Sequence, residues 1–227
     1  MNGTTKESIS NTSSTATNLT YNTYSNRKGI ICGGSTYSAD ATTFIQNINI
    51  NTFELTATNG VSISIWIYPT DISPFNSILT SFANNVQDSS WLGGGFLLKV
   101  SSSSIYYTYA NYANGGYAGS CYKTGLTISN NNWYHIVVTF NGVNKSGQIY
   151  LNNIGQSVTS ETDQQGEVSA LNISTSTNIL SIGTSNAISS FAGYSGENYP
   201  NFTGVISKFG IYNKVLTSAE VNSLYNA

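Results

Sequence analysis

The stretch FTGVISKFGIYNKVLTSAEVNSLYN, residues 202–226, changes its hydrophobic period halfway along its length. As far as Tyr212 it has the pattern of a β-strand with two distinct faces. One predicted face carries Val205, Ser207, Phe209 and Ile211, and the other carries Ile206, Lys208 and Tyr212. The stretch therefore begins as one strand of a sheet.

Beyond residue 213 the same stretch has the pattern of a helix. Its apolar residues recur at spacings of three and four, at Val221, Leu224 and Tyr225. A helix start signal, TSAE, precedes them: we expect Thr217 to cap the helix and Glu220 to reach back to the amide of Thr217. The sequence thus predicts one short helix at the end of a chain that otherwise has the pattern of strands.

Working outward, the rest of the chain has short apolar runs separated by Gly, Asn, Pro and Ser. In VSISIWIY, residues 61–68, the predicted core face carries Val61, Ile63, Ile65 and Ile67. Ser62, Ser64, Trp66 and Tyr68 are expected on the opposite face. Further strands are expected within residues 95–100, 104–109, 133–140, 147–153, 178–183 and 204–212. Many strands without helical crossovers predict an all-β fold, an antiparallel sandwich or jelly roll.

Composition limits what such a protein can bind. Only 8% of the 227 residues are charged, against a usual ~25%, and 16 are Tyr. The formal net charge is -2 and the basic residues are scattered, apart from Arg27 and Lys28, so we expect no nucleic-acid partner. Because no apolar run approaches the ~20 residues that cross a bilayer, we expect no membrane insertion.

The N-terminal region differs from the rest. Residues 1–24 are rich in Ser, Thr and Asn, and this composition cannot offset the entropy of ordering by itself. We therefore divide the chain into a low-complexity arm, residues 1–24, and a domain, residues 25–227, and expect the arm to serve in assembly. Its first 22 residues lack the apolar segment of a secretory signal peptide.

Several motifs in fixed order carry a family resemblance. They are NNWYHIVVTFNG (131–142), SGQIYLNNIGQS (146–157), LSIGTS (180–185) and the closing stretch, preceded by STYSADATTFIQNI (35–48) and VSISIWIYPTD (61–71). Together they resemble the laminin G-like branch of the concanavalin A-like lectin/glucanase superfamily over about residues 35–226. The resemblance implies a two-sheet jelly roll whose terminal helix closes the sandwich against one edge.

That superfamily contains both lectins and glucanases, so the fold alone does not choose a function. The jelly-roll glucanases place their carboxylates on one strand as Glu-x-Asp-x-Glu, and the nearest match here is ETDQQGE, with Glu161, Asp163 and Glu167. The third carboxylate comes too late, and QQG has the pattern of a loop. We therefore expect no enzyme activity, with a glycoside hydrolase as the remote alternative.

Metal and cysteine chemistry are also limited. The single histidine, His135, alternates with Val137 and Thr139, which predicts a framework residue with a hydrogen-bond partner, and no zinc spacing accompanies it. Calcium remains a candidate cofactor, with oxygen ligands to be sought among Asp71, Asp88, Asp163 and Glu197. Cys32 and Cys121 allow one disulfide at most, and the sequence leaves open whether they are close enough to form it.

The most distinctive chemistry lies in YYTYANYANGGYAGSCY, residues 106–122. Its candidate ligand-binding residues are Tyr112, Asn114, Tyr117 and Tyr122. Tyrosine rings suit the apolar faces of sugars, and they suit protein interfaces equally well. A third interpretation is that they cover the edges of the sandwich.

These observations lead to one preferred function. We expect a non-enzymatic, lectin-like recognition or adhesion module that is a structural or surface component of a larger extracellular assembly, such as a virion shell, a fibre or a surface layer. Its expected partners are other protein subunits and glycans, and its expected location is extracellular or at a virion or cell surface. The alternative is a free glycan-binding lectin domain assisted by calcium.

Overall fold

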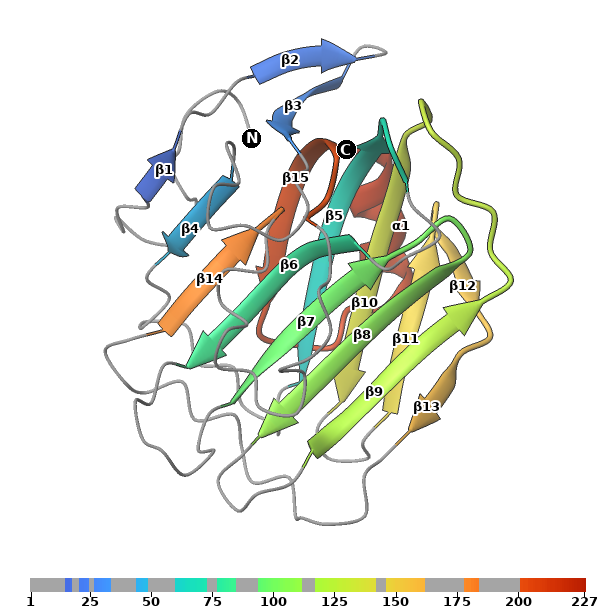
Figure 1. Cartoon of the computed structure of the whole chain (residues 1–227). Helices are drawn as coiled ribbons and strands as arrows, with labels where there is room; N and C mark the ends of the chain where they lie inside the picture. The colour runs from blue at the N-terminus through green and yellow to red at the C-terminus, as the bar shows by residue number, and fades with distance from the viewer. Residues whose placement is uncertain are drawn as a thin grey trace.

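We analysed a computed structural model of the chain (Figure 1). The structure describes residues 15–17, 21–24, 27–33, 44–48, 60–72, 77–84, 94–111, 117–141, 146–161, 178–183 and 201–227. Within these ranges the chain forms two β-sheets and one helix, α1. Neighbouring strands within each sheet pair in the antiparallel direction, which confirms the all-β sandwich predicted from the sequence.

The first sheet has eight strands in the order β1-β4-β14-β6-β7-β8-β9-β13. Their bounds are β1 Thr15–Thr17, β4 Phe44–Ile48, β14 Asn178–Ile182, β6 Ser77–Asn84, β7 Gly94–Val100, β8 Ser104–Asn111, β9 Tyr117–Thr124 and β13 Thr159–Glu161. The second sheet has seven strands in the order β12-β11-β10-β5-β15-β3-β2. Their bounds are β12 Ile154–Gln156, β11 Ser146–Leu151, β10 Tyr134–Asn141, β5 Val61–Pro69, β15 Gly204–Tyr212, β3 Arg27–Cys32 and β2 Tyr21–Tyr24.

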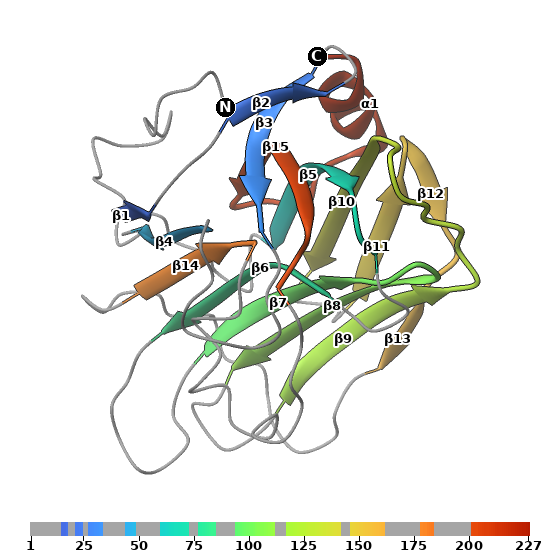
Figure 2. The ribbon, with the colours of Figure 1, turned by 45° about the horizontal axis from the view of Figure 1, so that its top comes forward.

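The core lies between the two sheets, which Figure 2 shows as separate layers. β5 is the central strand of the second sheet, and its predicted alternation is confirmed, because Ile63, Ile65 and Ile67 are completely buried in the core. Phe96 and Leu98 of β7 belong to the same core cluster from the first sheet. The alternate residues of β5 therefore point away from the core, toward the outer face of the second sheet.

The predicted face pattern of the closing strand is wrong in its second half. Ile206 and Ile211, which were expected on opposite faces, both belong to the core cluster. The register of β15 against β5 shifts between Ser207 and Gly210, and Lys208 within this bulge has a φ of 46°. An extra residue in one strand moves every side chain beyond it to the opposite face of the sheet, which is why simple alternation fails here.

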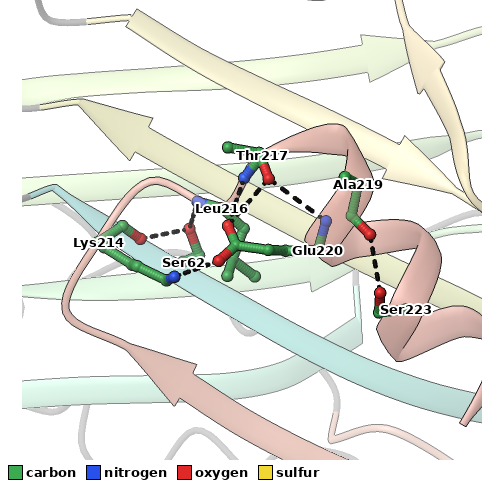
Figure 3. A network of polar contacts seen from close by, with 7 residues as sticks. All are labelled: Ser62, Lys214, Leu216, Thr217, Ala219, Glu220 and Ser223. Carbon is green, nitrogen blue, oxygen red and sulfur yellow. Dashed lines mark hydrogen bonds and ion pairs between the residues drawn. The ribbon is translucent and has the colours of Figure 1, made fainter.

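The terminal helix α1, Ser218–Asn226, begins with the predicted capping box (Figure 3). Thr217 Oγ1 accepts a hydrogen bond from the Glu220 amide, and the Glu220 carboxylate accepts one from the Thr217 amide at 2.9 Å. Ser62 Oγ of β5 donates to the Lys214 carbonyl at 2.7 Å and accepts from the Leu216 amide at 3.0 Å. The connection into the helix is thus fixed to the central strand of the sheet.

The position of α1 corrects one expectation. The family resemblance implied a helix against an edge of the sandwich, whereas α1 packs on the outer face of the seven-stranded sheet. Val221 and Leu216 form a second apolar cluster with Val137 of β10, a strand in the sheet interior. The sheet therefore carries apolar contacts on both faces near β10.

The capping box gives a first prediction. Replacing Thr217 by Ala removes the acceptor for the Glu220 amide and should lower the free energy of unfolding by about 1 kcal/mol. Urea denaturation followed by circular dichroism measures the change. Thr217→Ser keeps the hydroxyl and serves as the control, which should lose much less stability. An identical loss in both variants would contradict the capping role.

Two segments of the predicted arm lie in the sheets. β1 pairs with β4 at one edge of the eight-stranded sheet, and β2 pairs with β3 at one edge of the seven-stranded sheet. The other residues before Tyr21 lie outside the described part of the chain. Division of the chain at residue 24, and an assembly role for the arm, remain predictions.

Candidate functional site

The predicted tyrosine-rich loop is described only in part. Tyr112 and Asn114 lie outside the described residues, and Tyr117 begins β9. Tyr122 lies farther along β9 and is half-buried. The loop as a binding site therefore stays a prediction, and Tyr122 is the member whose surroundings can be described.

Tyr122 belongs to a row of three side chains that crosses neighbouring strands, here called the tyrosine row: Lys99, Tyr106 and Tyr122. Lys99 of β7 pairs with Tyr106 of β8, which in turn pairs with Tyr122 of β9. The two tyrosine rings are stacked with centroids 5.1 Å apart, and the Lys99 Nζ lies 5.5 Å from the Tyr106 centroid. Because their sequence neighbours Leu98, Ile105 and Cys121 lie in the core, all three point to the outer face of the eight-stranded sheet.

The geometry of the tyrosine row limits what it can bind. A centroid separation close to the spacing between strands means that the rings stand upright on the sheet. Upright rings present their edges and the outer parts of their faces, with the hydroxyl groups pointing away from the backbone. Lys99, only 5% exposed, places a cation beside this pair. Such a surface can contact both the apolar and the hydroxyl groups of a polar ligand.

The two cysteines are free thiols and both are buried. Cys32 of β3 packs beside Gly183, whereas Cys121 of β9 packs beside Gly147. Burial raises the pKa of each thiol to about 12. At neutral pH both therefore behave as small apolar side chains rather than as nucleophiles.

Most of the carboxylates singled out in the sequence lie outside the described part of the chain. Glu161 is the last residue of the edge strand β13, while Asp163 and Glu167 lie outside the described residues. Of the calcium candidates, Asp71 is exposed after β5, and Asp88, Asp163 and Glu197 are outside the described ranges. Where side chains are described, no group of three His, Cys, Asp or Glu residues could hold a metal ion.

A second group of aromatic residues, which the sequence analysis did not single out, lies on the outer face of the seven-stranded sheet. We call it the ring cluster. Its members are Tyr24, Trp66, Tyr68, Trp133, His135 and Tyr225. They come from β2, from β5, from β10 and the turn before it, and from α1. The cluster therefore joins the N-terminal hairpin and the terminal helix to the centre of the sheet.

Trp66 lies at the centre of this cluster and is 7% exposed. Its ring is stacked on His135, with centroids 4.9 Å apart, and on Tyr225, with centroids 5.4 Å apart. Trp133 meets it edge-on at 6.5 Å. Trp133 Nε1 also donates a 2.8 Å hydrogen bond to the Tyr24 carbonyl, which links the edge strand β2 to the turn before β10.

His135 is a buried framework histidine, as predicted. It is 1% exposed, and its Nε2 lies 2.9 Å from Ser64 Oγ on the adjacent strand β5. Burial, followed by the charges of Arg27 and Lys208, lowers its pKa to about 4. The ring is therefore neutral at physiological pH.

Two cations accompany the ring cluster. The guanidinium carbon of Arg27 lies 3.7 Å from the Trp66 ring centroid and 5.8 Å from that of Trp133. Lys208 is exposed on the bulge of β15. Burial lowers the pKa of Lys208, and the charge of Arg27 lowers it further, so the two cations act on one another.

A match to a family model extends across most of the chain. The model is that of the laminin G-type concanavalin A-like lectin/glucanases superfamily, and it matches residues 41–222. The chain belongs to the concanavalin A-like lectin/glucanases superfamily. This membership confirms the laminin G-like resemblance found in the sequence motifs. No curated protein sequence matches the chain significantly.

Three solved structures illustrate the proteins whose fold is similar to that of this chain. The botulinum neurotoxin serotype G binding domain has 16% identity and a TM-score of 0.61, covering 94% of this chain and 46% of its own. The heptameric SAP-like pentraxin of Limulus polyphemus has 17% identity and a TM-score of 0.54, and the match covers 86% of this chain and 80% of the pentraxin chain. The CBM40 of Ruminococcus gnavus IT-sialidase, bound to α2,3-sialyllactose, has 14% identity and a TM-score of 0.52, and the match covers 85% of this chain and 96% of the CBM40 chain.

These likenesses show the fold alone, because all three identities are low. The chain spans about half the length of the toxin binding domain that it matches. Among the described residues, no helix is long and apolar enough to span a membrane. The fold by itself does not determine what a member of this superfamily does.

Proposed function

We propose that the protein is a non-catalytic module that recognises glycans through the tyrosine row. The observation that carries the proposal is the stacked pair Tyr106 and Tyr122 beside Lys99, on the outer face of the eight-stranded sheet. Sugars combine apolar C–H faces with hydroxyl groups, and half-buried tyrosines offer a surface of the same mixed character at low cost in conformational entropy.

The absence of catalysis is part of this proposal. The nearest carboxylate motif in the sequence has the wrong spacing for a retaining glycosidase. The buried cysteines have raised pKa values, and His135 is enclosed by packed rings, so none of these three is placed to act as a nucleophile or base. The similar toxin binding domain and the sialyllactose-bound CBM40 support a role in binding.

The setting that we propose is an extracellular assembly or a virion or cell surface, in which the module also contacts other protein subunits. The chain has only 8% charged residues, and its polar surface relies on Ser, Thr, Asn and Tyr. Tyrosine is favoured at protein interfaces, while charged residues are depleted at their centres. The Ser/Thr/Asn-rich region before residue 25 is the segment proposed to serve these subunit contacts.

The test is binding of the full chain to an immobilised panel of neutral and acidic glycans. The wild type should bind at least one class, and Tyr122→Ala should weaken that binding tenfold or more, because it removes one ring of the stacked pair. Surface plasmon resonance measures the affinity. Tyr122→Phe keeps the ring and is the matched control, expected to retain most of the binding. Wild-type affinity in Tyr122→Ala, or no binding to any glycan, would overturn the proposal.

A further inference from the structure

Two basic side chains, Arg27 and Lys208, lie beside the ring cluster and are coupled by charge repulsion. Neither forms an ion pair with a carboxylate in the described part of the chain. Arg27 lies against Trp66, and its charge acts on both Lys208 and His135. The one ion pair between described residues joins Lys214 to Glu220, at the start of α1. The outer face of the seven-stranded sheet thus carries a local positive charge that its described neighbours do not neutralise.

The contact between Arg27 and Trp66 leaves the hydrogen-bonding edge of the guanidinium available. At 3.7 Å from the ring centroid the guanidinium lies flat on the indole, since an edge-on approach would hold its carbon farther away. Flat stacking uses the apolar face of the guanidinium, while its N–H donors point outward in its own plane. This planar set of donors matches the paired oxygens of a carboxylate or a sulfate.

Lys208 is held beside this site by an unusual backbone conformation. Its φ of 46° lies in the left-handed region, where residues other than Gly and Asn are seldom found, and it lies on the bulge that separates Ser207 from Gly210. Bulges redirect side chains and are common beside functional sites. A strained residue retained at such a place suggests a role other than stability, because Asn or Gly would fit the same backbone with less strain.

The rings below the cations contain buried polar atoms without partners. Trp66 Nε1 and His135 Nδ1 have no hydrogen-bond partner among the described residues, although both side chains are more than nine-tenths buried. The indole N–H is a donor only, and Nδ1 is a donor when Nε2 accepts from Ser64. Cations and unpartnered donors in one cluster favour a ligand that supplies acceptor oxygens.

We propose that the ring cluster binds a saccharide whose ring carries an oxyanion, either a carboxylate or a sulfate. Arg27 and Lys208 hold the anion, and the partly exposed rings of Tyr24, Tyr68 and Trp133 contact the apolar face of the sugar. This inference rests on the proposed function in taking the ligand to be a glycan. Its site is a second one, on the opposite sheet from the tyrosine row.

Four small probes separate the contributions of charge and ring: glucose, glucuronic acid, glucose 6-sulfate and inorganic sulfate. Each is titrated into the full-length protein labelled with ¹⁵N, and the indole N–H signals of Trp66 and Trp133 are followed by NMR. We expect both charged sugars to bind at least tenfold more tightly than glucose and than inorganic sulfate. If glucose binds as tightly as the charged sugars, the cluster does not recognise the anion. If inorganic sulfate binds as tightly as they do, the cluster does not recognise the sugar ring. Either result overturns the proposal.

Lys208→Asn is the decisive variant, because Asn accepts the left-handed backbone without the charge. It should weaken binding of the charged sugars at least fivefold while its thermal midpoint stays equal to or above that of the wild type. Lys123→Gln, which removes a lysine from β9 in the other sheet, is the matched control and should bind normally. Unchanged binding in Lys208→Asn overturns the proposal.

The two experiments test the tyrosine row and the ring cluster independently. If Tyr122→Ala abolishes binding to the immobilised glycans while the charged sugars leave the indole signals unmoved, the proposed function stands and the ring cluster has no ligand of this class. If the charged sugars shift the indole signals and Lys208→Asn abolishes this response, the ring-cluster site stands whatever the tyrosine row does.

Discussion

Replacing Trp66 by Ala is expected to lower the free energy of unfolding by about 3 to 5 kcal/mol, as for other large buried aromatic residues. Trp66 is 7% exposed and contacts four other groups, namely the rings of His135, Tyr225 and Trp133 and the guanidinium of Arg27. Its loss removes the stacked contact between β5 and Tyr225 of α1, and leaves the tilted contact between His135 and Tyr225. The loss is a large fraction of the total stability of about 5 to 15 kcal/mol typical of a domain.

Urea denaturation followed by circular dichroism measures this effect. Trp66→Phe is the control, because it keeps an apolar ring in the stack and should lose less than half as much. Limited proteolysis offers a second measurement, since release of α1 should expose residues after Tyr212 to cleavage in Trp66→Ala. A decrease below about 1 kcal/mol would mean that the cluster is not packed as described.

Acid should destabilise the fold through His135. The folded-state pKa of about 4 lies below the ordinary value of 6.5, so the unfolded chain binds the proton more readily. The contribution of neutral His135 is therefore complete above pH 6.5, decreases as the pH falls, and is lost when the pH reaches about 4. The difference in pKa corresponds to about 3 kcal/mol over this window.

Urea denaturation at half-unit steps from pH 7.5 to pH 3.5 tests this dependence. His135 is the only histidine, so His135→Asn should flatten the stability profile between pH 6.5 and pH 4. Glu220 titrates in a lower window: its hydrogen bond with Lys214, followed by those with Thr217, lowers its pKa to about 2. Its contribution is present above pH 4.5 and is lost toward pH 2. An unchanged slope in His135→Asn above pH 4.5 would contradict the assignment.

Local patterns in the sequence predicted the elements whose physics is local. The alternation in β5 places Ile63 and Ile65 in the core because successive side chains of a strand point to opposite faces of the sheet. The capping box of Thr217 and Glu220 is confirmed because it depends on residues three positions apart. The hairpin between β11 and β12 has positive φ angles at Asn152 and Asn153, as a two-residue turn requires.

Features that depend on distant pairing were not predictable in the same way. The bulge at Lys208 arises where β15 pairs with β5. Gly210, at the end of the bulge, is a local signal within β15, but a glycine does not by itself say where the register shifts. Trp66 and His135 were both placed on the faces that prove to be outward, which is the signal that could have revealed the ring cluster. Their neighbours Tyr24 and Tyr225 come from opposite ends of the chain, however, and the alternation of a single strand carries no information about them.

The order of strands in the seven-stranded sheet also determines when the protein can finish folding. β15 lies between β5 and β3, and the Ser207 hydroxyl donates to the Lys28 carbonyl across 179 residues of sequence. During synthesis from the N-terminus, β3 has no place in the sheet until β15 has left the ribosome, so the hairpin of β2 and β3 must wait with unpaired strand edges. Contacts this distant slow folding and prolong the exposure of those edges. Nascent chains of this protein should therefore depend on chaperones until nearly the whole domain has been made.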